Sequence, residues 1–235
     1  MTRHLAIVGY GKMGKLIEQH APEYGFEVHS RIDAGDNLAQ AKGADVAIEF
    51  TLPSVVAGNV ETLAGLGVPV VVGTTGWLGE MDRVREVVER SKTGLVWSPN
   101  FSIGVNVFFR LVREAARLLE NEPQYGAWAW EIHHHTKKDA PSGTLLKLVE
   151  EMKNAGYTRT VDTSSNRAGA HPGTHEIGFD SVADTITLRH AARSREGFAR
   201  GALKAAQWLP GKRGVFKFED ILFQPVAPGA TVHTR

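Results

Sequence analysis

The sequence predicts a two-domain α/β protein, in which a doubly wound parallel sheet is joined to an α+β domain built on an open mixed sheet. Short apolar strands alternate with amphipathic helices through the first hundred residues, as in a parallel sheet that helices cover on both faces. Beyond Asn106 strands dominate, and residues 184–192 alternate as in a sheet with one covered face. We expect residues 1–102 plus 196–235 to form one domain and residues 103–195 a second.

The first expected strand, residues 4–10, runs directly into the glycine-rich loop GYGKMG. Gly9 allows a tight turn, Gly11 lets a pyrophosphate approach the backbone, and Gly14 lets the next helix pack close to the strand. A second strand-like run ends at Asp33, where Rossmann-type domains place the carboxylate that binds the adenosine ribose. The residues expected to contact a dinucleotide here are Gly9, Tyr10, Gly11, Lys12, Met13, Gly14 and Asp33.

The same segment bears on the choice between NADH and NADPH. Ala34 follows Asp33, so the arginine that often accepts a 2′-phosphate is missing from that position. This favours NADH. Lys12 and Lys15 could still bind a 2′-phosphate, and NADPH therefore stays a second candidate.

The rest of the first domain follows the strand–helix rhythm. Strands are expected at residues 26–32, 44–50, 68–72 and 95–97, and helices at 13–21, from the turn at 51–54 to about 66, and at 78–92. Ligands of an open parallel sheet lie outside the carboxyl ends of its strands. The segments that follow these strands should therefore edge the crevice of the glycine loop, although each could be a plain connection. The expected cofactor contacts are Phe50, Thr51, Gly73, Thr74, Thr75, Ser98, Asn100 and Phe101.

The second domain contains a long helix and several strands. The helix should run from after Asn106 to about residue 121, and strands are expected at 127–134, 173–180 and 184–192, with a loop at 160–166. The segment 167–175 is rich in Gly and His, and it is either a surface or interface loop or part of a site. A helix at 198–209 and a strand and turn at 214–223 should return to the first domain, by analogy with two-domain oxidoreductases.

The most unusual segment, EIHHHTKKDAPSGT at residues 131–144, concentrates imidazoles and ammonium groups. On a strand His133 and His135 should share one face, with His134 on the other. The proline that follows Asp139-Ala140 turns the chain. Ser142-Gly143-Thr144 then opens an apolar-periodic helix, whose first N–H groups bind anions. The segment predicts a pocket for a small polycarboxylate that needs a proton.

Each feature of this segment is also compatible with a plain structural role. Consecutive histidines can be surface residues, a Lys-Lys pair is usually solvated, and Ser-Gly-Thr can be an ordinary helix cap. Two histidines on one strand face can also bind zinc, but a zinc site needs a third ligand, and Lys137 and Lys138 would repel the ion. We expect no metal.

Composition narrows the function classes. The formal charge of +1, with Lys and Arg dispersed along the chain, gives no long-range attraction to nucleic acid. Cysteine is absent, so no disulfide, thiolate metal site or cysteine nucleophile is available. No apolar run reaches the length of a membrane span, and the first strand is not preceded by a signal-peptide pattern. We expect a cytoplasmic protein that binds neither nucleic acid nor membrane.

The motifs together resemble the 4-hydroxy-tetrahydrodipicolinate reductase family over essentially the whole chain. They are VGYGKMG, EFTLP, GTTG, SPNFSIGVN, the signature E-x-H-H-x-x-K-x-D-A-P-S-G-T, RAG with GTH, and SREGFARGA with a following Trp. The chain departs from the family at Thr174, where many members have Glu, in the shorter loop at 160–166, and at His135, where the family varies. These departures put only local loop geometry in doubt.

The resemblance implies an NAD(P)H-dependent reduction of 4-hydroxy-tetrahydrodipicolinate to tetrahydrodipicolinate with loss of water, in diaminopimelate and lysine biosynthesis. His133 matches the general acid of the family and Lys137 its second donor. The residues implied to hold the carboxylates of the substrate are His134, Ser142, Gly143 and Thr144. A homotetramer built through the sheet of the second domain is also implied.

Two rival functions share the glycine loop. One is another Rossmann dehydrogenase of amino-acid metabolism, such as an aspartate dehydrogenase, and the other is a non-enzymatic NAD(P)H sensor. The first should lack the H-H-x-x-K and P-S-G-T pair, and the second has no need of His133 and Lys137 side by side.

Overall fold

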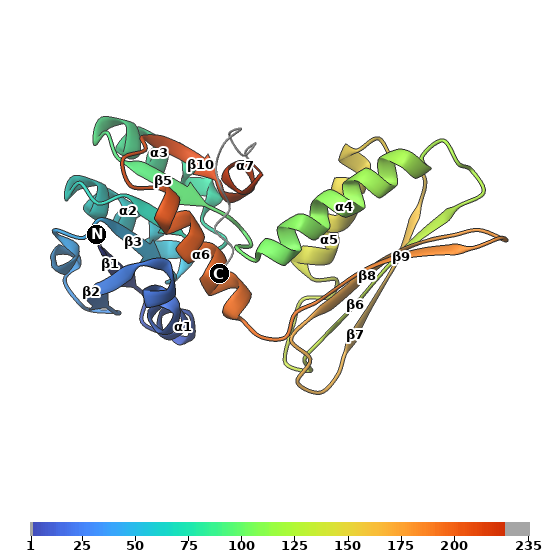
Figure 1. Cartoon of the computed structure of the whole chain (residues 1–235), viewed down its shortest axis with the longest axis horizontal. Coiled ribbons are helices and arrows are strands. Elements are labelled where there is room, and N and C mark those ends of the chain that lie inside the picture. Colours follow the sequence, from blue (N-terminus) through green and yellow to red (C-terminus); the bar gives the residue numbers. More distant parts are fainter. Residues whose placement is uncertain (1, 224–235) are drawn as a thin grey trace. The chain divides into compact units, whose positions relative to one another are not determined.

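A computed structural model describes residues 2–223 of the chain (Figure 1). The described residues form two compact units, one up to Phe101 together with the residues from Phe198 onward, and the other Ser102–Gly197. Each unit has its own sheet. In the described part of the chain, no helix combines the length and apolarity that a membrane crossing requires.

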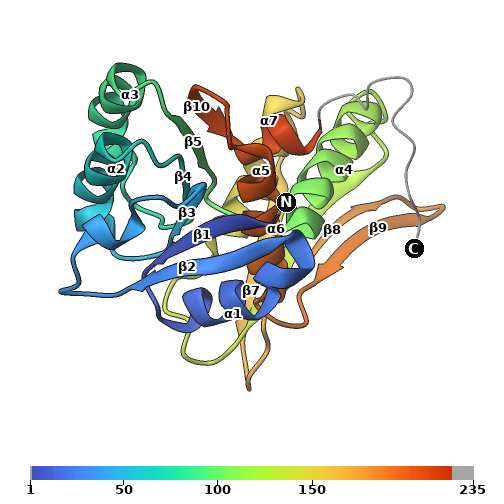
Figure 2. The ribbon, with the colours of Figure 1, turned by 60° about the vertical axis from the view of Figure 1, so that its left-hand side comes forward.

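The first unit is built on a six-stranded parallel sheet, whose strand order is β10-β5-β4-β3-β1-β2 (Figure 2). The strands are β1 (Arg3–Val8), β2 (Phe26–Ile32), β3 (Val46–Glu49), β4 (Val70–Val72), β5 (Gly94–Trp97) and β10 (Gly214–Lys217). Every residue of β3 and β4 is buried, which explains why both strands are apolar apart from Glu49 at the end of β3. The predicted Rossmann-type parallel sheet is confirmed.

Helices connect and cover these strands. They are α1 (Lys12–His20), α2 (Val56–Gly65), α3 (Met81–Arg90), α6 (Glu196–Trp208) and α7 (Phe218–Leu222), with 3₁₀ turns at Ala21–Tyr24, Leu38–Ala41, Pro53–Val55 and Leu78–Glu80. Val60 and Leu63 of α2 and Val84 and Val88 of α3 belong to one buried core with strand residues such as Val70. This core fixes the strand ends at which the connecting loops begin.

The chain reverses its direction of winding at β1. This strand has β2 on one side and β3 on the other, so the connections that leave β1 and β3 diverge at its carboxyl end. Such a switch point is where open parallel sheets bind ligands. The topology therefore marks the loops after Val8 and Glu49 as the edges of a binding site.

The second unit holds a four-stranded mixed sheet of order β7-β6-β8-β9. Its strands are β6 (Gly126–His133), β7 (Val161–Arg167), β8 (Thr174–Asp180) and β9 (Thr185–Ala191). Helices α4 (Ile103–Leu119) and α5 (Gly143–Asn154) lie side by side against this sheet (Figure 1). Phe108, Leu148 and Ile177 contribute to the core between the helices and the strands. The predicted open mixed sheet is confirmed.

Residues 160–166 were expected to form a loop, and this prediction is wrong. Residues 161–166 belong to β7, which pairs in parallel with β6 from Val161 to Arg167. Most of its side chains are exposed at the sheet edge, so VDTSSNR carries no apolar alternation that would mark a strand. The pairing comes from the backbone of β6, which is remote in sequence.

Three local expectations also need correction. The long helix begins at Ile103 and not after Asn106, because the Ser102 side chain accepts the Val105 N–H at 3.3 Å and caps it. Strand β6 ends at His133, so His134 and His135 lie beyond the strand and the predicted facing of His135 does not apply. The turn expected after the last strand is the short helix α7.

Helix α6 approaches the segment at Phe101 so closely that only glycine fits at position 201. A Cβ there would lie 1.7 Å from the Phe101 carbonyl oxygen. We predict that Gly201→Ala lowers the free energy of unfolding by about 3 kcal/mol, since a displaced helix must open the surrounding core. Denaturant unfolding followed by circular dichroism measures this change.

Gly58→Ala is the matched control, because Gly58 lies inside the exposed part of α2 and a Cβ there would meet nothing within 4 Å. That substitution should be neutral or stabilise by about 0.5–1 kcal/mol. Equal effects of the two substitutions would contradict the close approach.

Candidate active site

The first candidate site is a cleft of ≈ 360 Å³ at the carboxyl ends of β1, β3 and β4. Eight residues expected to contact the cofactor line it, with Pro53 as an unpredicted ninth: Gly11, Lys12, Met13, Phe50, Thr51, Pro53, Gly73, Thr74 and Thr75. The loops named by the switch-point topology and the loop after β4 therefore meet at one place.

The glycines of the first loop differ in what surrounds them. At Gly9, where φ is +91°, a Cβ would lie 2.0 Å from the Phe50 carbonyl oxygen, and at Gly14 it would lie 2.4 Å from the Gly9 carbonyl oxygen. At Gly11 a Cβ would meet nothing within 4 Å. Two glycines thus pack the loop tightly against its neighbours, while the third leaves open space in the cleft. This is the division of roles that a dinucleotide pyrophosphate requires.

A buried carboxylate lies at the end of β3, beside two loops of the cleft. Glu49 is fully buried and accepts hydrogen bonds from the Thr51 hydroxyl, from Thr74 Oγ1 at 2.8 Å and from Asn59 Nδ2 at 3.3 Å. Thr74 Oγ1 in turn accepts the Thr51 N–H at 2.7 Å. Burial raises the pKa of Glu49, and the hydrogen bonds from Thr51, Thr74 and Asn59 offset this only in part. Glu49 thereby ties the loop after β3 to the loop after β4.

The other expected cofactor residues lie outside the lining of this cleft. Tyr10 donates its hydroxyl to Glu18 on α1, and exposed Asp33 begins the turn after β2, with its Oδ1 accepting the Ala34 N–H at 2.9 Å. Ser98 Oγ donates to the Asn100 carbonyl at 2.7 Å and shapes the loop after β5. The Phe101 ring is 2% exposed and packs on Phe218, so a ligand could reach little more than its backbone. Whether these residues contact a nucleotide stays a prediction.

The second candidate site surrounds Glu131 of β6, which is completely buried. Glu131 Oε1 accepts hydrogen bonds from the Ser142 N–H at 2.8 Å, from Ser165 Oγ at 3.0 Å and from Arg167 Nη2 at 2.9 Å. Oε2 accepts the Ser142 hydroxyl and lies 3.3 Å from His175 Nε2. Burial opposes ionisation, but His175, Ser142 and Arg167 outweigh it and hold the pKa of Glu131 well below its usual range. A charged carboxylate therefore binds β7, β8 and α5 to β6.

Ser142 joins this carboxylate to the start of α5. Its Oγ accepts the Leu145 N–H at 3.2 Å, so the predicted helix cap is confirmed. Gly143 is exposed and Thr144 is partly exposed in the first turn of the helix. The helix end therefore presents backbone N–H groups and a hydroxyl at the surface, as anion binding requires.

His133 is the last residue of β6 and is 8% exposed. Its Nδ1 lies 3.4 Å from Glu131 Oε2, and its ring meets the His175 ring edge to face with centroids 5.1 Å apart. Burial lowers the pKa of His133 to about 4, Glu131 opposes this, and His175, Lys137 and Arg167 lower it further. In the ligand-free protein at pH 7 this imidazole is therefore neutral.

The flanking polar residues make local contacts. Lys137 Nζ lies 2.8 Å from Asp139 Oδ1, and His134 Nδ1 lies 2.7 Å from the Thr136 hydroxyl. His135 Nδ1 lies 2.8 Å from the Gly169 carbonyl, so it holds the adjacent loop. Lys137 is partly buried beside an exposed partner, and His134 is partly exposed.

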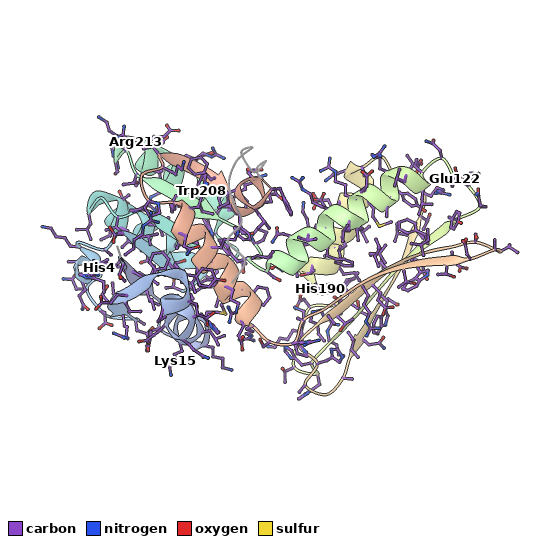
Figure 3. The ribbon with its side chains drawn as sticks, in the orientation of Figure 1. His4, Lys15, Glu122, His190, Trp208 and Arg213 are labelled. Carbon is purple, nitrogen blue, oxygen red and sulfur yellow. The ribbon has the colours of Figure 1, made fainter. Side chains whose placement is uncertain are left out.

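Sequence reasoning missed Glu131, Arg167 and His175 as site residues. Residues 167–175 were expected to be either a surface or interface loop or part of a site. The ends of this segment belong to the candidate site, because Arg167 and His175 both contact Glu131. The signal available was the position of Glu131, two residues before His133 and hence on the same face of β6. His190, labelled in Figure 3, lies opposite His175 on β9. Its ring stacks on Phe108 of α4 with centroids 6.0 Å apart.

Glu131, His133 and His175 each bring one possible ligand atom to within 4.8 Å of the others. This set differs from the pair of strand histidines considered from the sequence, because His135 lies beyond the strand and is not part of it. Glu131 is, however, already bound by the Arg167 guanidinium and by Ser142, and a metal ion would have to compete with that positive charge. These contacts describe a hydrogen-bonded network better than a metal centre, and the absence of a metal stays a prediction.

The raised pKa of Glu49 has a consequence for stability. The folded protein holds this proton more tightly than the unfolded chain, so wild-type stability falls as pH rises from the ordinary value of 4.5 through the raised pKa. Glu49→Gln cannot ionise. We predict that the melting temperature of this variant, relative to wild type, rises by about 2 °C or more between pH 4.5 and pH 7.5.

Calorimetry at both pH values measures the relative melting temperature. Glu86→Gln, on the exposed face of α3, is the matched control and should show no such change. A relative melting temperature of Glu49→Gln that is the same at both pH values would contradict the raised pKa.

Comparisons with known proteins agree over nearly all of the described residues. Residues 3–101 match the family model described as dihydrodipicolinate reductase, N-terminus, and residues 104–222 match that described as dihydrodipicolinate reductase, C-terminus. A 4-hydroxy-tetrahydrodipicolinate reductase of Christiangramia forsetii is 34% identical over 93% of this chain and 97% of its own length. One of Anaeromyxobacter dehalogenans (strain 2CP-1) is 40% identical over 80% of this chain and 76% of its own.

A solved structure supports the fold. It is a dipicolinate-bound dihydrodipicolinate reductase from Paenisporosarcina sp. TG-14, with a TM-score of 0.81 and 21% identity over 94% of this chain and all of its own. The two family models together span nearly all described residues, and the relatives exceed 30% identity over most of the chain. This chain belongs to the dihydrodipicolinate reductase family.

Proposed function

We propose that this protein reduces 4-hydroxy-tetrahydrodipicolinate to tetrahydrodipicolinate with loss of water, in the diaminopimelate and lysine pathway, with NADH or NADPH as the reductant. Its curated relatives carry the name of that reductase. The observation that supports the proposal most is the second site, where a neutral buried imidazole, an ammonium group and a capped helix end occur within twelve residues of sequence, His133 to Thr144. A dianionic ring that must gain a proton suits this set of groups.

The proposed substrate is held by charge and by helix-end hydrogen bonds. Gly143 and Thr144 would bind one carboxylate at the start of α5, and His134 would assist. Ser142 was also expected to bind it, but its N–H is donated to Glu131. Ser142 contributes mainly by capping, because its hydroxyl is already donated to Glu131. A dianion next to His133 would raise the pKa of that imidazole, because nearby negative charge favours the protonated form. Substrate binding would thus charge the group that must donate a proton.

Lys137 supplies a second positive group. Its pairing with exposed Asp139 leaves it near the surface, where it can turn to a ligand at small cost because exposed ion pairs contribute little stability. We propose that its ammonium holds or protonates the leaving oxygen. Loss of water removes the ring hydroxyl together with a neighbouring C–H proton, so the overall reaction takes up one hydride and one proton. The C–H proton would restore the Lys137 ammonium, and His133 would donate the one proton that balances hydride arrival.

The first unit would bind the nucleotide. Gly9, Gly11 and Gly14 would accommodate the pyrophosphate, and exposed Asp33 would bind the ribose hydroxyls. The bound coenzyme supplies the hydride. Ala34 favours NADH, while exposed Lys12 and Lys15 allow NADPH. The reaction requires this nucleotide and the dicarboxylate of the second unit to meet.

A homotetramer and a cytoplasmic location are further proposals. On β6, buried residues alternate with Trp128, Trp130 and Ile132, which point to the other face of the mixed sheet. These three side chains are only partly buried. Partly exposed aromatic side chains on a sheet suit contact with other copies of the chain. Light scattering of the purified protein should then give four times the chain mass. The lack of cysteine is in keeping with a cytoplasmic location.

One assay tests the proposed activity. Aspartate semialdehyde and pyruvate are added with the preceding synthase, and NADH or NADPH absorbance is followed. Consumption of coenzyme that requires the synthase supports the reductase. Consumption of coenzyme with aspartate-type substrates and ammonia would indicate an aspartate dehydrogenase instead, and coenzyme binding without turnover would indicate a sensor.

We predict that His133→Gln and Lys137→Ala each lower turnover about a hundredfold or more, the usual scale of an acid–base contribution. Steady-state kinetics with saturating coenzyme measure this. His135→Gln and Lys138→Ala are the matched controls, because both residues are exposed neighbours to which we assign no chemistry, and they should retain near-normal turnover. Near-normal turnover in both test variants would contradict the roles proposed for His133 and Lys137.

A further inference from the structure

A buried carboxylate, Glu131, lies beside the proposed general acid. It has no exposed surface, and its contacts divide between its two oxygens. Oε1 accepts three donors, the Ser142 N–H, Ser165 Oγ and Arg167 Nη2. Oε2 accepts the Ser142 hydroxyl and faces the imidazoles of His133 and His175. Oε1 is therefore held by structural hydrogen bonds, whereas Oε2 faces the imidazole of the proposed general acid.

The donors around Glu131 require it to be ionised. The Ser142 N–H and the Arg167 guanidinium can only donate. The Ser142 hydroxyl already accepts the Leu145 N–H, so its own hydrogen is free to be donated to Oε2. The imidazoles that face Oε2 can accept a hydrogen, but the Arg167 guanidinium and the Ser142 N–H at Oε1 favour the ionised carboxylate. The site therefore holds a negative charge.

The imidazole of His133 faces that charge with its inner nitrogen. Nδ1 lies 3.4 Å from Glu131 Oε2, is buried, and has no hydrogen-bond partner among the described residues. A Cβ added at Gly173 would lie 2.8 Å from Nε2, so glycine at that position makes room for the outer edge of the ring. A proton on Nδ1 would find an acceptor in Glu131 after a small movement of the ring.

Other charged groups act on His133 in the opposite direction. Lys137 from the following loop, Arg167 from β7 and His175 from β8 all disfavour its protonated form, and Asp139 is paired with Lys137. Glu131 acts against them at close range. Resting on the proposed function, we infer that Glu131 is a positioning residue that orients His133 and stabilises its protonated form during the reaction.

Glu131→Gln tests the inference, because it keeps the size of the side chain and removes the charge. The pKa of His133 is measured by NMR of the histidine ring protons, assigned by comparison with His133→Gln. It should be lower in Glu131→Gln than in the otherwise unchanged protein by about one pH unit or more. This measurement uses no substrate, so it remains decisive if the protein proves inactive in the reductase assay.

The pH profile of turnover gives a second readout. In Glu131→Gln, the part of the pH profile in which turnover falls as the general acid loses its proton should move to lower pH. Turnover at pH 7 should fall tenfold or more, while the Michaelis constant for coenzyme should change less than twofold. Loss of turnover with an unmoved profile and an unmoved His133 pKa would show a purely structural role and overturn the inference.

Two further variants complete the test, one as a control that keeps the charge of Glu131 and one as a substitute in case Glu131→Gln does not fold. Ser165→Ala removes one donor to Glu131 but leaves its charge, so the pKa of His133 should stay within a few tenths of wild type. Should the glutamine variant not fold, Glu131→Asp shortens the side chain and lengthens the 3.4 Å approach to His133. It should lower the pKa of His133 in the same direction by a smaller amount, and an unchanged pKa there would overturn the inference.

Discussion

The second unit depends on the burial of one ionised carboxylate. Glu131 lies on a middle strand of the mixed sheet, and Arg167 of β7, His175 of β8 and Ser142, which caps α5, all turn toward it. A buried charge without these donors would be costly, so the fold must supply all of them together. The edge strand, the neighbouring strand and the helix start are thereby fixed relative to the catalytic histidine candidate.

The first unit also contains a buried carboxylate that is held by hydrogen bonds, but from uncharged donors. Glu49 is buried at the end of β3 and is held by hydroxyl and amide donors without any cation among its hydrogen-bond partners in the described residues. Its pKa is raised, whereas that of Glu131 is lowered. The difference follows from the partners, because His175, Ser142 and the Arg167 guanidinium together compensate Glu131, whereas the donors to Glu49 are neutral hydroxyl and amide groups. Both carboxylates hold backbone in place beneath the residues that would touch a ligand.

Much of the first unit was predictable because its signals are local. The glycine loop, the strand Phe26–Ile32 and the helices follow from apolar periodicity and glycine spacing within short stretches. Strand β7 could not be predicted, since its polar edge residues pair only with a remote strand. The network around Glu131 was missed for a related reason. Ser142 is 11 residues away from Glu131 in the sequence, Ser165 is 34 and Arg167 is 36.

The fold class, the glycine loop, the capped start of α5 and the family could all be inferred from the sequence, because each depends on residue types at fixed short spacings. Three features became visible only in the folded chain: Glu131 receives donors from three elements, His133 is buried and neutral while His135 holds a loop, and Phe101 belongs to a core. Burial and charge compensation depend on groups brought together from distant parts of the chain, and no local pattern of residues encodes them.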